Sequence, residues 1–266
     1  MSAGHYVFAN GDSIASQRLQ LLAEIFDPVS HACFERIGVA PGWSCWEVGA
    51  GYGTIAQWLH ERVAPDGYVL ATDLDPRFLA RLAQHNLRVL RHDIVDGPLP
   101  ARSFDLIHAR LLLCHLPSRE RVLDRMIEAL KPGGWLVIED FDGLSLPPNP
   151  TLNPAERLLR SSAAVRELLR SAGAELNFGR RVAGLLRERG MSDVNAEGRV
   201  FLSDEERFVR FQRLTIEQVQ DELLARKLVS PEELADDLAT LDQRYMALLP
   251  TMWSVVARRQ EPTSRS

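Results

Sequence analysis

The sequence predicts an α/β protein built on a doubly wound, mostly parallel seven-stranded sheet. Two patterns in the 266 residues indicate this fold class. Up to residue 142, short apolar runs alternate with segments whose apolar residues recur at helical spacing. The apolar runs are nearly continuous, which is typical of strands buried on both faces by helices. Because strand–helix–strand connections join parallel neighbours, we expect most of the sheet to be parallel.

The expected strands are bounded by turn residues or acids. Gly49 follows the first strand, Asp73 closes the second, and Pro132-Gly133 precedes the fifth. The expected strands span residues 44–48, 68–72, 87–90, 104–109, 135–138, 192–198 and 251–258. We expect the last of them at an edge of the sheet.

Helices are expected between these strands and in the long segment after residue 150. Pro76 suits the first turn of one helix. Ser203–Glu206 and Ser230–Glu233 each match a capping box, in which serine and glutamate satisfy the first backbone N–H groups of a helix. The expected helices span residues 17–38, 54–63, 76–82, 118–130, 154–171, 179–189, 204–226 and 231–247.

The chain divides into a sheet domain with two helical additions. We expect residues 1–40 to form an N-terminal helical lid and residues 201–249 a helical cap inserted above the sheet. Residues 41–200 and 250–266 would form the sheet domain. In such sheets ligands bind at the carboxyl ends of the strands, so the loops there are the expected site.

Charge and composition exclude several classes of protein. The chain has 31 Lys and Arg against 36 Asp and Glu, and the net charge of −5 counts against a dedicated nucleic-acid binder. No apolar run reaches the ~18 residues of a membrane span, and no signal peptide opens the chain. The three cysteines are far apart, and neither a disulfide framework nor a metal site is indicated. We expect a cytoplasmic protein with neither a membrane nor a nucleic-acid partner.

A glycine-rich turn, Gly49-Ala50-Gly51-Tyr52-Gly53, joins the first expected strand to the next helix. Glycines allow a tight turn and the close approach of a ligand. Thr54 stands where the dinucleotide-binding fingerprint has its third glycine. Glu47 suits a cationic or hydroxylated ligand better than a pyrophosphate. These two departures disfavour a NAD-dependent oxidoreductase, and a turn without any ligand remains the alternative.

Two further acids lie at the ends of expected strands. Asp73 stands where a carboxylate can accept hydrogen bonds from both ribose hydroxyls. Its alternative role is a helix cap, for which Asp75 is better placed. Asp93 could accept a hydrogen bond from an adenine amino group, or it could be a solvated turn residue.

Five segments, in this order and at this spacing, resemble the motifs of the class I S-adenosylmethionine-dependent methyltransferases, which have a Rossmann-like fold. They are residues 47–53, 71–76, 92–94, 104–110 and 130–136, within a similar stretch over 45–142. Tyr52 departs from the family, which often has a small residue there. The resemblance implies a methyltransferase that uses S-adenosyl-L-methionine and releases S-adenosyl-L-homocysteine.

The resemblance also implies roles for individual residues. The glycine loop would lie near the methionine part, Glu47 would orient that part or its amino group, and the Ala109 carbonyl would accept from its ammonium. Asp73 would hold the ribose, and adenine would lie between Leu74 and the Asp93-Ile94 pair. The expected cofactor-binding residues of these motifs are Glu47, Gly49, Ala50, Gly51, Gly53, Asp73, Leu74, Asp93, Ile94 and Ala109.

Two residues of the expected lid are added as candidates. The carboxylate of the methionine part needs a donor, and Arg18 is our candidate, with an ordinary exposed arginine as the alternative. Tyr6 would fold over the cofactor, with a purely packing role as the alternative.

The implied chemistry needs little from the protein beyond placement. The sulfonium methyl is already activated, so in-line alignment and desolvation can supply much of the rate without a metal. An acceptor that must lose a proton needs a base. Our candidates are Asp140, which alternation directs away from Glu139 and which has Asp142 as a neighbour, and His115. Loop capping and packing are the alternatives, and His108 is expected to be structural.

The acceptor is expected to be a small molecule. A helical lid and a late helical insertion resemble natural-product methyltransferases, which suggests methylation of O, N or a nucleophilic carbon of an aromatic or heteroaromatic compound. Aromatic and methionine residues of the C-terminal third could line a pocket for it, or form the core of the cap. They are Phe178, Phe201, Phe208, Phe211, Tyr245, Met246, Met252 and Trp253.

Two other functions stay open. A methyltransferase acting on RNA or protein would show a basic rim, for which the candidates are Arg180, Arg181, Arg187 and Arg189. A catalytically silent subunit would bind S-adenosylmethionine and work through a partner. Pairing of two copies through the cap helices is also left open.

Overall fold

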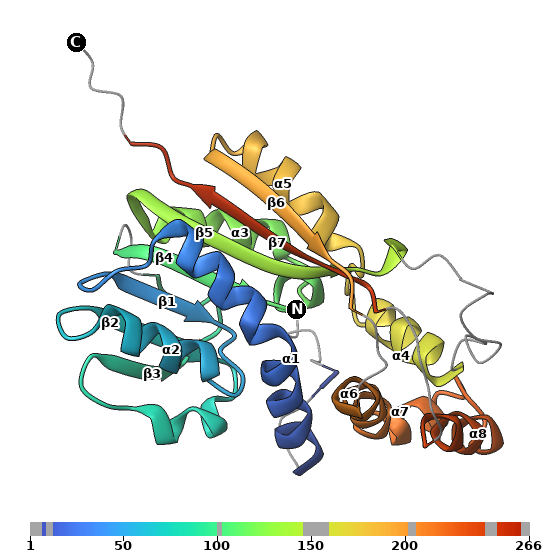
Figure 1. Ribbon diagram of the computed structural model, residues 1–266. Coiled ribbons are helices and arrows are strands. Elements are labelled where there is room, and N and C mark those ends of the chain that lie inside the picture. The colour runs from blue at the N-terminus through green and yellow to red at the C-terminus, as the bar shows by residue number, and fades with distance from the viewer. Residues whose placement is uncertain are drawn as a thin grey trace.

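The computed structural model describes residues 7–8, 13–99, 103–145, 160–201, 206–242 and 249–261. It contains a seven-stranded sheet with the strand order β3-β2-β1-β4-β5-β7-β6 (Figure 1). The strands are β1 (Ser44–Val48), β2 (Tyr68–Asp73), β3 (Leu87–Arg91), β4 (Phe104–Arg110), β5 (Leu130–Asp142), β6 (Ser192–Arg199) and β7 (Thr251–Arg258). The helices are α1 (Ser13–Ile37), α2 (Thr54–Val63), α3 (Arg119–Ala129), α4 (Arg160–Ser171), α5 (Phe178–Glu188), α6 (Glu206–Glu217), α7 (Gln220–Ala225) and α8 (Pro231–Leu241). The predicted fold class is confirmed.

β7 lies inside the sheet, so the expectation of an edge strand was wrong. Strands β1 to β5 run parallel, and β7 pairs antiparallel with both β5 and β6. Most residues of β7 are buried, whereas no residue of β6 is. An interior strand needs apolar residues on both faces, and the polar sequence of β6 suits only an edge. Pairing with β7 also extends β5 to Asp142, beyond the expected end.

Helices cover both faces of the sheet. On one face lie α1 and α2, and Phe34 of α1 packs in a cluster with Leu106 of β4. On the other face lie α3 and α5, and Met126 of α3 packs in a cluster with Ile107. Leu106 and Ile107 are neighbours in β4, so their opposite partners follow from the alternation of side chains along a strand.

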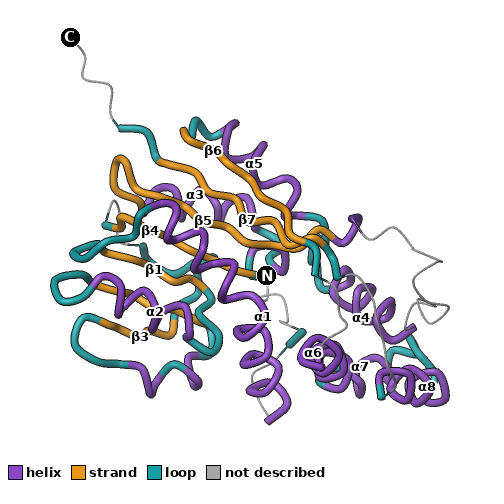
Figure 2. The backbone as a smooth tube through the Cα atoms, in the orientation of Figure 1, coloured by secondary structure: helices purple, strands orange, loops and turns teal. Residues whose placement is uncertain are grey.

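Helices α4, α6, α7 and α8 gather beside the sheet (Figure 2). Leu168 of α4 packs in one apolar cluster with Ile216, Leu223 and Leu234 of the other three helices. The sequence placed α4 in the sheet domain, but its buried stripe faces α6, α7 and α8. The cap of this protein therefore includes α4, and we use "cap" for these four helices from here on.

Helix α1 joins the sheet to the cap. Its C-terminal half packs on the sheet through Cys33 and Phe34. Its N-terminal half projects beyond the sheet (Figure 1). Phe26, at the middle of the helix, packs in a cluster with Phe208 of α6 and Met252 of β7. Neither α1 nor any other described helix is long and apolar enough to cross a membrane.

The helix expected over residues 76–82 is replaced by two 3₁₀ turns, Pro76–Phe78 and Ala80–Leu82. Such tight turns are common as short connectors between strands. The Asp75 carboxylate accepts a hydrogen bond from the Arg77 N–H, which confirms Asp75 as the cap of this segment.

The two expected capping boxes have different outcomes. At α8 the Glu233 N–H donates to Ser230 Oγ at 3.1 Å, and the Ser230 N–H donates to Glu233 Oε2 at 3.0 Å. This box is confirmed. The box at Ser203 lies outside the described residues, as do the expected helix segments at 154–159 and 243–247.

Gly179 of α5 should tolerate no side chain. A Cβ at this position would lie 2.2 Å from the backbone oxygen of Asp140 in β5. A backbone atom of an interior strand cannot rotate away, so we expect Gly179→Ala to lower the free energy of unfolding by about 3 kcal/mol. Urea denaturation measures this change.

Gly184 on the same helix provides the matched control. A Cβ at Gly184 would meet no atom within 4 Å. Because alanine has the higher helix propensity, Gly184→Ala should raise the free energy of unfolding by up to about 1 kcal/mol. Equal effects of the two substitutions would contradict the close packing of α5 on β5.

Candidate functional site

The glycine loop between β1 and α2 has a left-handed backbone at three positions. The φ angles are +71° at Gly49, +53° at Gly51 and +87° at Gly53. Only glycine adopts such angles without strain. The N–H groups of Gly49 and Ala50 both donate to the Thr72 carbonyl, at 2.8 and 2.9 Å. The turn is thereby fixed to the end of β2.

Other segments approach this loop closely. A Cβ on Gly49 would lie 3.2 Å from Leu112, which follows β4. A Cβ on Gly51 would lie 3.6 Å from Leu19 of α1. The loop is therefore bordered by α1 on one side and by the residues after β4 on the other, as a site at the carboxyl edge requires.

Asp73 links the end of β2 to the glycine loop. Its Oδ2 accepts a hydrogen bond from the Gly51 N–H and its Oδ1 accepts one from the Asp75 N–H, both at 3.0 Å. Burial raises the pKa of Asp73, and the backbone donors oppose that rise. A carboxylate has about four lone-pair positions, so two more donors, such as ribose hydroxyls, can still be accepted.

The residues expected around adenine differ in their surroundings. Leu74 is a large apolar side chain that is 50% exposed beside Asp73. Asp93 accepts from the Val95 N–H at 2.8 Å, so it has the expected alternative role of a turn residue. Ile94 is buried in the core cluster of the α3 and α5 face. Leu74 is thus the residue that offers an open apolar surface.

Glu47 belongs to a buried row of three ionisable side chains. His108 of β4 lies between two glutamates, with Nδ1 2.6 Å from Glu47 Oε2 and Nε2 3.2 Å from Glu139 Oε2. All three side chains are at most 4% exposed. Burial acts to lower the pKa of His108, but the two carboxylates outweigh it and raise the pKa to about 9. Burial acts to raise the pKa of Glu139, yet His108 and other partners lower it to about 2.

This row continues to α1 through Glu139. Ser30 and Ser254 both donate their hydroxyls to the Glu139 carboxylate. Arg110 donates to Ser30 Oγ at 2.9 Å and to Asp27 Oδ1 at 2.7 Å. The sequence assigned His108 a structural role because it lies within a strand. His108 lies opposite Glu47 because β1 and β4 are parallel neighbours in the sheet. The sequence analysis did not predict which strands are neighbours, so it did not predict this pair.

Arg18 is buried, so the alternative of an exposed surface arginine was wrong. The residue is only 5% exposed, and its Nε donates a hydrogen bond to Gln218 Oε1 of the cap at 2.6 Å. Its guanidinium carbon lies 4.4 Å above the ring centre of Phe8. No pattern in the sequence predicted that Gln218 and Phe8 would be partners of Arg18. Tyr6 lies outside the described residues.

His115 lies in the turn after β4, near the same residues. Its ring meets the Phe8 ring edge-on with the centroids 6.3 Å apart. Burial, with smaller contributions from Arg18 and Arg119, lowers the pKa of His115 to about 4. The imidazole is therefore neutral at pH 7 and can accept a proton, although only as a weak base.

Asp140 is wholly buried, whereas the sequence expected it at an open edge. Its Oδ2 accepts from the Cys114 N–H at 3.2 Å. Burial raises the pKa of Asp140 to about 7. Glu139 lies on the opposite face, as strand alternation predicted. The turn after β4 contacts the Asp140 side chain through the Cys114 N–H, and Gly179 of α5 packs on the Asp140 backbone, so both cover this part of β5. A direct catalytic role for Asp140 stays a prediction, which this burial does not favour.

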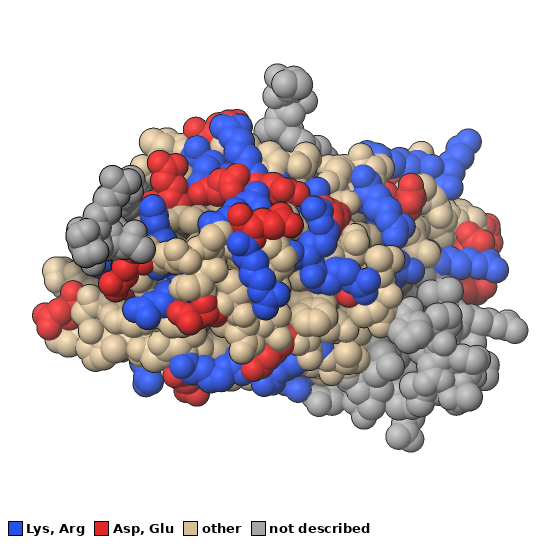
Figure 3. Space-filling view, turned by 90° about the horizontal axis from the view of Figure 1, so that it is seen from above, with Lys and Arg blue, Asp and Glu red and all other residues tan. Residues whose placement is uncertain are grey.

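The four arginines of the expected basic rim are engaged within the protein. Arg180 pairs with Asp142 at 2.6 Å, and Arg181 and Arg189 pair with carboxylates on α3 or the loop before α5. Arg187 donates to a backbone carbonyl. Figure 3 shows positive and negative side chains interspersed on the face seen from above. These arginines therefore do not form a continuous positively charged surface.

The aromatic residues of the C-terminal third are mainly core. Phe26 of α1 makes edge-on ring contacts with Phe201 and Phe211, and Phe208 and Met252 belong to the same cluster. Phe178, the first residue of α5, is wholly buried. Of the two expected roles, lining a pocket or forming a core, these residues have the second. Tyr245 and Met246 lie outside the described residues.

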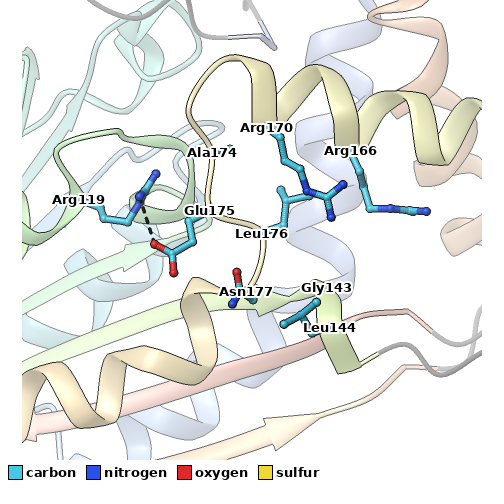
Figure 4. A pocket seen from close by; sticks show the side chains of 9 residues that line it. All are labelled: Arg119, Gly143, Leu144, Arg166, Arg170, Ala174, Glu175, Leu176 and Asn177. Carbon is cyan, nitrogen blue, oxygen red and sulfur yellow. Dashed lines mark hydrogen bonds and ion pairs between the residues drawn. The ribbon is translucent and has the colours of Figure 1, made fainter. Parts of the chain in front are cut away.

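A pocket of about 250 Å³ lies between α4 and the end of β5 (Figure 4). Its lining residues are Arg119, Gly143, Leu144, Arg166, Arg170, Ala174, Glu175, Leu176 and Asn177. Arg119 pairs with Glu175 at 3.2 Å, and the Arg170 side chain reaches toward Leu176 (Figure 4). The pocket combines positive and apolar groups beside the cap.

Comparison with known proteins finds similarity to methyltransferases. Residues 46–138 match the family model described as a methyltransferase domain. Methyltransferase str3 of Strobilurus tenacellus is 35% identical over 153 residues, which cover 57% of this chain and 54% of that protein. The ubiquinone/menaquinone biosynthesis C-methyltransferase UbiE of Bordetella parapertussis is 26% identical over 174 residues, covering 60% and 67%. The chain thus spans about half the length of str3, and 34% of the related str2.

Solved structures share the fold at low sequence identity. Phosphoethanolamine N-methyltransferase 2 of Haemonchus contortus, in complex with S-adenosyl-L-methionine, has a TM-score of 0.61 at 16% identity, covering 97% of this chain and 60% of that one. The [4+2]-cyclase SpnF has a TM-score of 0.52 at 16% identity, covering 89% and 81%. One fold therefore carries different activities, and the activity must be argued from the site.

The row of Glu47, His108 and Glu139 predicts a pH-dependent stability. A histidine whose pKa is raised in the folded state stabilises it fully below the unfolded value of 6.5, and that contribution is lost as the pH rises through about 9. We expect the free energy of unfolding to fall by on the order of 2 kcal/mol between these pH values. Urea denaturation at pH 6 to 9 measures the fall.

His108→Gln provides the control for that measurement. The variant should be less stable at pH 6, because it leaves buried carboxylates with fewer donors. Its stability should then change little up to pH 9. An equally steep loss in the variant would assign the pH dependence to other groups.

Proposed function

Because residues 46–138 match a methyltransferase domain, we propose that this chain is a class I S-adenosylmethionine-dependent methyltransferase that transfers the methyl group to a small molecule. One observation carries the proposal. The Asp73 carboxylate, at the end of β2, is fixed to the Gly51 N–H of a three-glycine loop, with the exposed Leu74 beside it. A carboxylate with spare acceptor positions, next to an open apolar surface, suits a ribose carrying a flat base.

We infer that the described residues would hold this cofactor at its base, its ribose and its methionine part. Asp73 would accept from the ribose hydroxyls, and Leu74 would pack on adenine. The left-handed glycines leave room for the methionine part, and Arg18 supplies a buried cation for its carboxylate. When bound, the cofactor supplies a methyl group on a sulfonium, which needs no further activation.

The protein's own part in transfer is placement and the exclusion of water. α1 and the turn after β4 border the glycine loop, and Gln218, between α6 and α7 of the cap, accepts a hydrogen bond from Arg18 of α1. An acceptor held between them would be desolvated and aligned with the methyl carbon. His115, neutral at pH 7, is the proposed proton acceptor, while Asp140 would act only by holding the Cys114 backbone beneath that turn.

A small acceptor is favoured over RNA or protein by the charges of the surface. The rim arginines are paired, and the net charge of the chain is −5. The name of UbiE, a C-methyltransferase of ubiquinone and menaquinone biosynthesis, gives further support for a small-molecule class. Within that class we propose an aromatic or heteroaromatic compound methylated on O, N or carbon.

Methyl-labelled S-adenosylmethionine tests both parts of the proposal. The protein is incubated with the labelled cofactor and cell extract, and small molecules are separated from macromolecules. We expect label in the small-molecule fraction, where mass and fragmentation identify the acceptor atom. Label in RNA or protein would overturn the small-molecule proposal. Cofactor binding without transfer to any fraction would instead favour a silent subunit.

Asp73→Ala tests whether binding uses this site. Losing two hydrogen bonds to a charged group should weaken cofactor binding about 100-fold, measured by calorimetry. Asp75→Ala is the matched control, because Asp75 caps the 3₁₀ turn and pairs with Arg77. That variant should change the affinity less than about threefold. Similar losses in both would place the binding site elsewhere.

A further inference from the structure

His108 is a wholly buried histidine that the proposed reaction does not use. We propose that it is a positioning residue for the methionine end of the cofactor, acting through Glu47. This inference rests on the proposed function. His108 itself would touch no cofactor atom. It would hold the Glu47 carboxylate ionised and in one orientation, two residues before the glycine loop.

The geometry gives the imidazole only one arrangement. Nδ1 is 2.6 Å from Glu47 Oε2 and Nε2 is 3.2 Å from Glu139 Oε2, so both nitrogens face carboxylate oxygens. A neutral imidazole has one donor nitrogen, whereas the cation has two. The Phe34 ring of α1 lies edge-on at 5.0 Å and limits rotation of the histidine. The orientation of Glu47 is therefore set by a cation that is itself held from both sides.

The far glutamate is held firmly enough to serve as an anchor. Glu139 accepts from His108 and from the hydroxyls of Ser30 and Ser254. Arg110 lies next to it and is balanced by Asp27 at 2.7 Å. His108 is thus fixed to β5, β7 and α1 on one side, which leaves Glu47 as the end of the row nearest the glycine loop.

The charge of the row matches the expected ligand. Two carboxylates and one imidazolium, with the Arg110–Asp27 pair balanced, sum to a net negative charge. S-adenosylmethionine carries an ammonium and a sulfonium at its methionine end, and both are attracted to such a row. Burial raises the pKa of Glu47, and His108 opposes that rise. Without the imidazolium, that opposition would be lost and the pKa of Glu47 would rise further, which would weaken the attraction.

Two ligands separate this role from general structural support. S-adenosylhomocysteine has the amino-acid end with its ammonium, whereas 5′-methylthioadenosine keeps only the adenosine and the thioether. In His108→Gln we expect S-adenosylhomocysteine to bind about tenfold more weakly, a loss of about 1.4 kcal/mol. The affinity for 5′-methylthioadenosine should change less than twofold. Calorimetry at low temperature keeps a destabilised variant folded during the measurement.

A double-mutant cycle shows whether His108 acts through Glu47. Glu47→Gln removes the charge but keeps the shape, and it should give the same selective loss. The double variant should bind S-adenosylhomocysteine no more weakly than either single variant, because the two residues act on one interaction. Additive losses would overturn the proposal, and so would an equal loss of affinity for both ligands.

The unsubstituted protein provides a measurement that does not depend on a variant folding. The Nδ1 chemical shift of His108 should move when S-adenosylhomocysteine binds and stay fixed when 5′-methylthioadenosine binds. A shift of equal size with both ligands would overturn the proposal. Failure of the protein to bind either ligand would instead contradict the proposed function itself.

Discussion

The burial of the central sheet on both faces is the constraint on which the rest of this structure depends. Helices cover both sides of β1, β4 and β5, so the interior of each strand must be apolar or have its polar groups satisfied internally. The glycine loop and the Asp73 carboxylate consequently lie at the carboxyl ends of the strands, outside the buried interior. The row of Glu47, His108 and Glu139 is an internal exception among several buried polar residues of the sheet, and each of its members has charged or hydroxyl partners.

Local elements of this fold could be predicted from sequence because each is specified by nearby residues. The boundaries of β1 and β7 were predicted to the residue, since apolar runs and turn residues mark them. The place of β7 between β5 and β6 could not be predicted in the same way. Spatial order depends on which surfaces are left to bury after the other strands have paired, and local patterns do not contain that information.

The candidate site likewise has a part that nearby residues specify and a part that depends on distant residues. Its backbone part, the glycine loop with Asp73, follows from a motif and was found in the sequence. Its side-chain surroundings depend on residues far away in the chain. Arg18 is buried and hydrogen-bonded to Gln218, 200 residues away in the chain, and Asp140 is buried where the turn after β4 and helix α5 pack on β5. Such burial arises from tertiary packing, which the composition around Arg18 or Asp140 does not reveal.

The position of β7 between β5 and β6 also has a consequence for how the chain is made. During synthesis β6 leaves the ribosome before β7, and in the finished sheet β6 is hydrogen-bonded to β7 alone. The cap helices α6, α7 and α8 are made while β6 still has no partner. The sheet is completed when residues 251–258 insert between two strands synthesised long before them. Assembly of this sheet is therefore governed by contacts distant in sequence, the kind that fold slowly and leave strand edges open to aggregation until the last strand arrives.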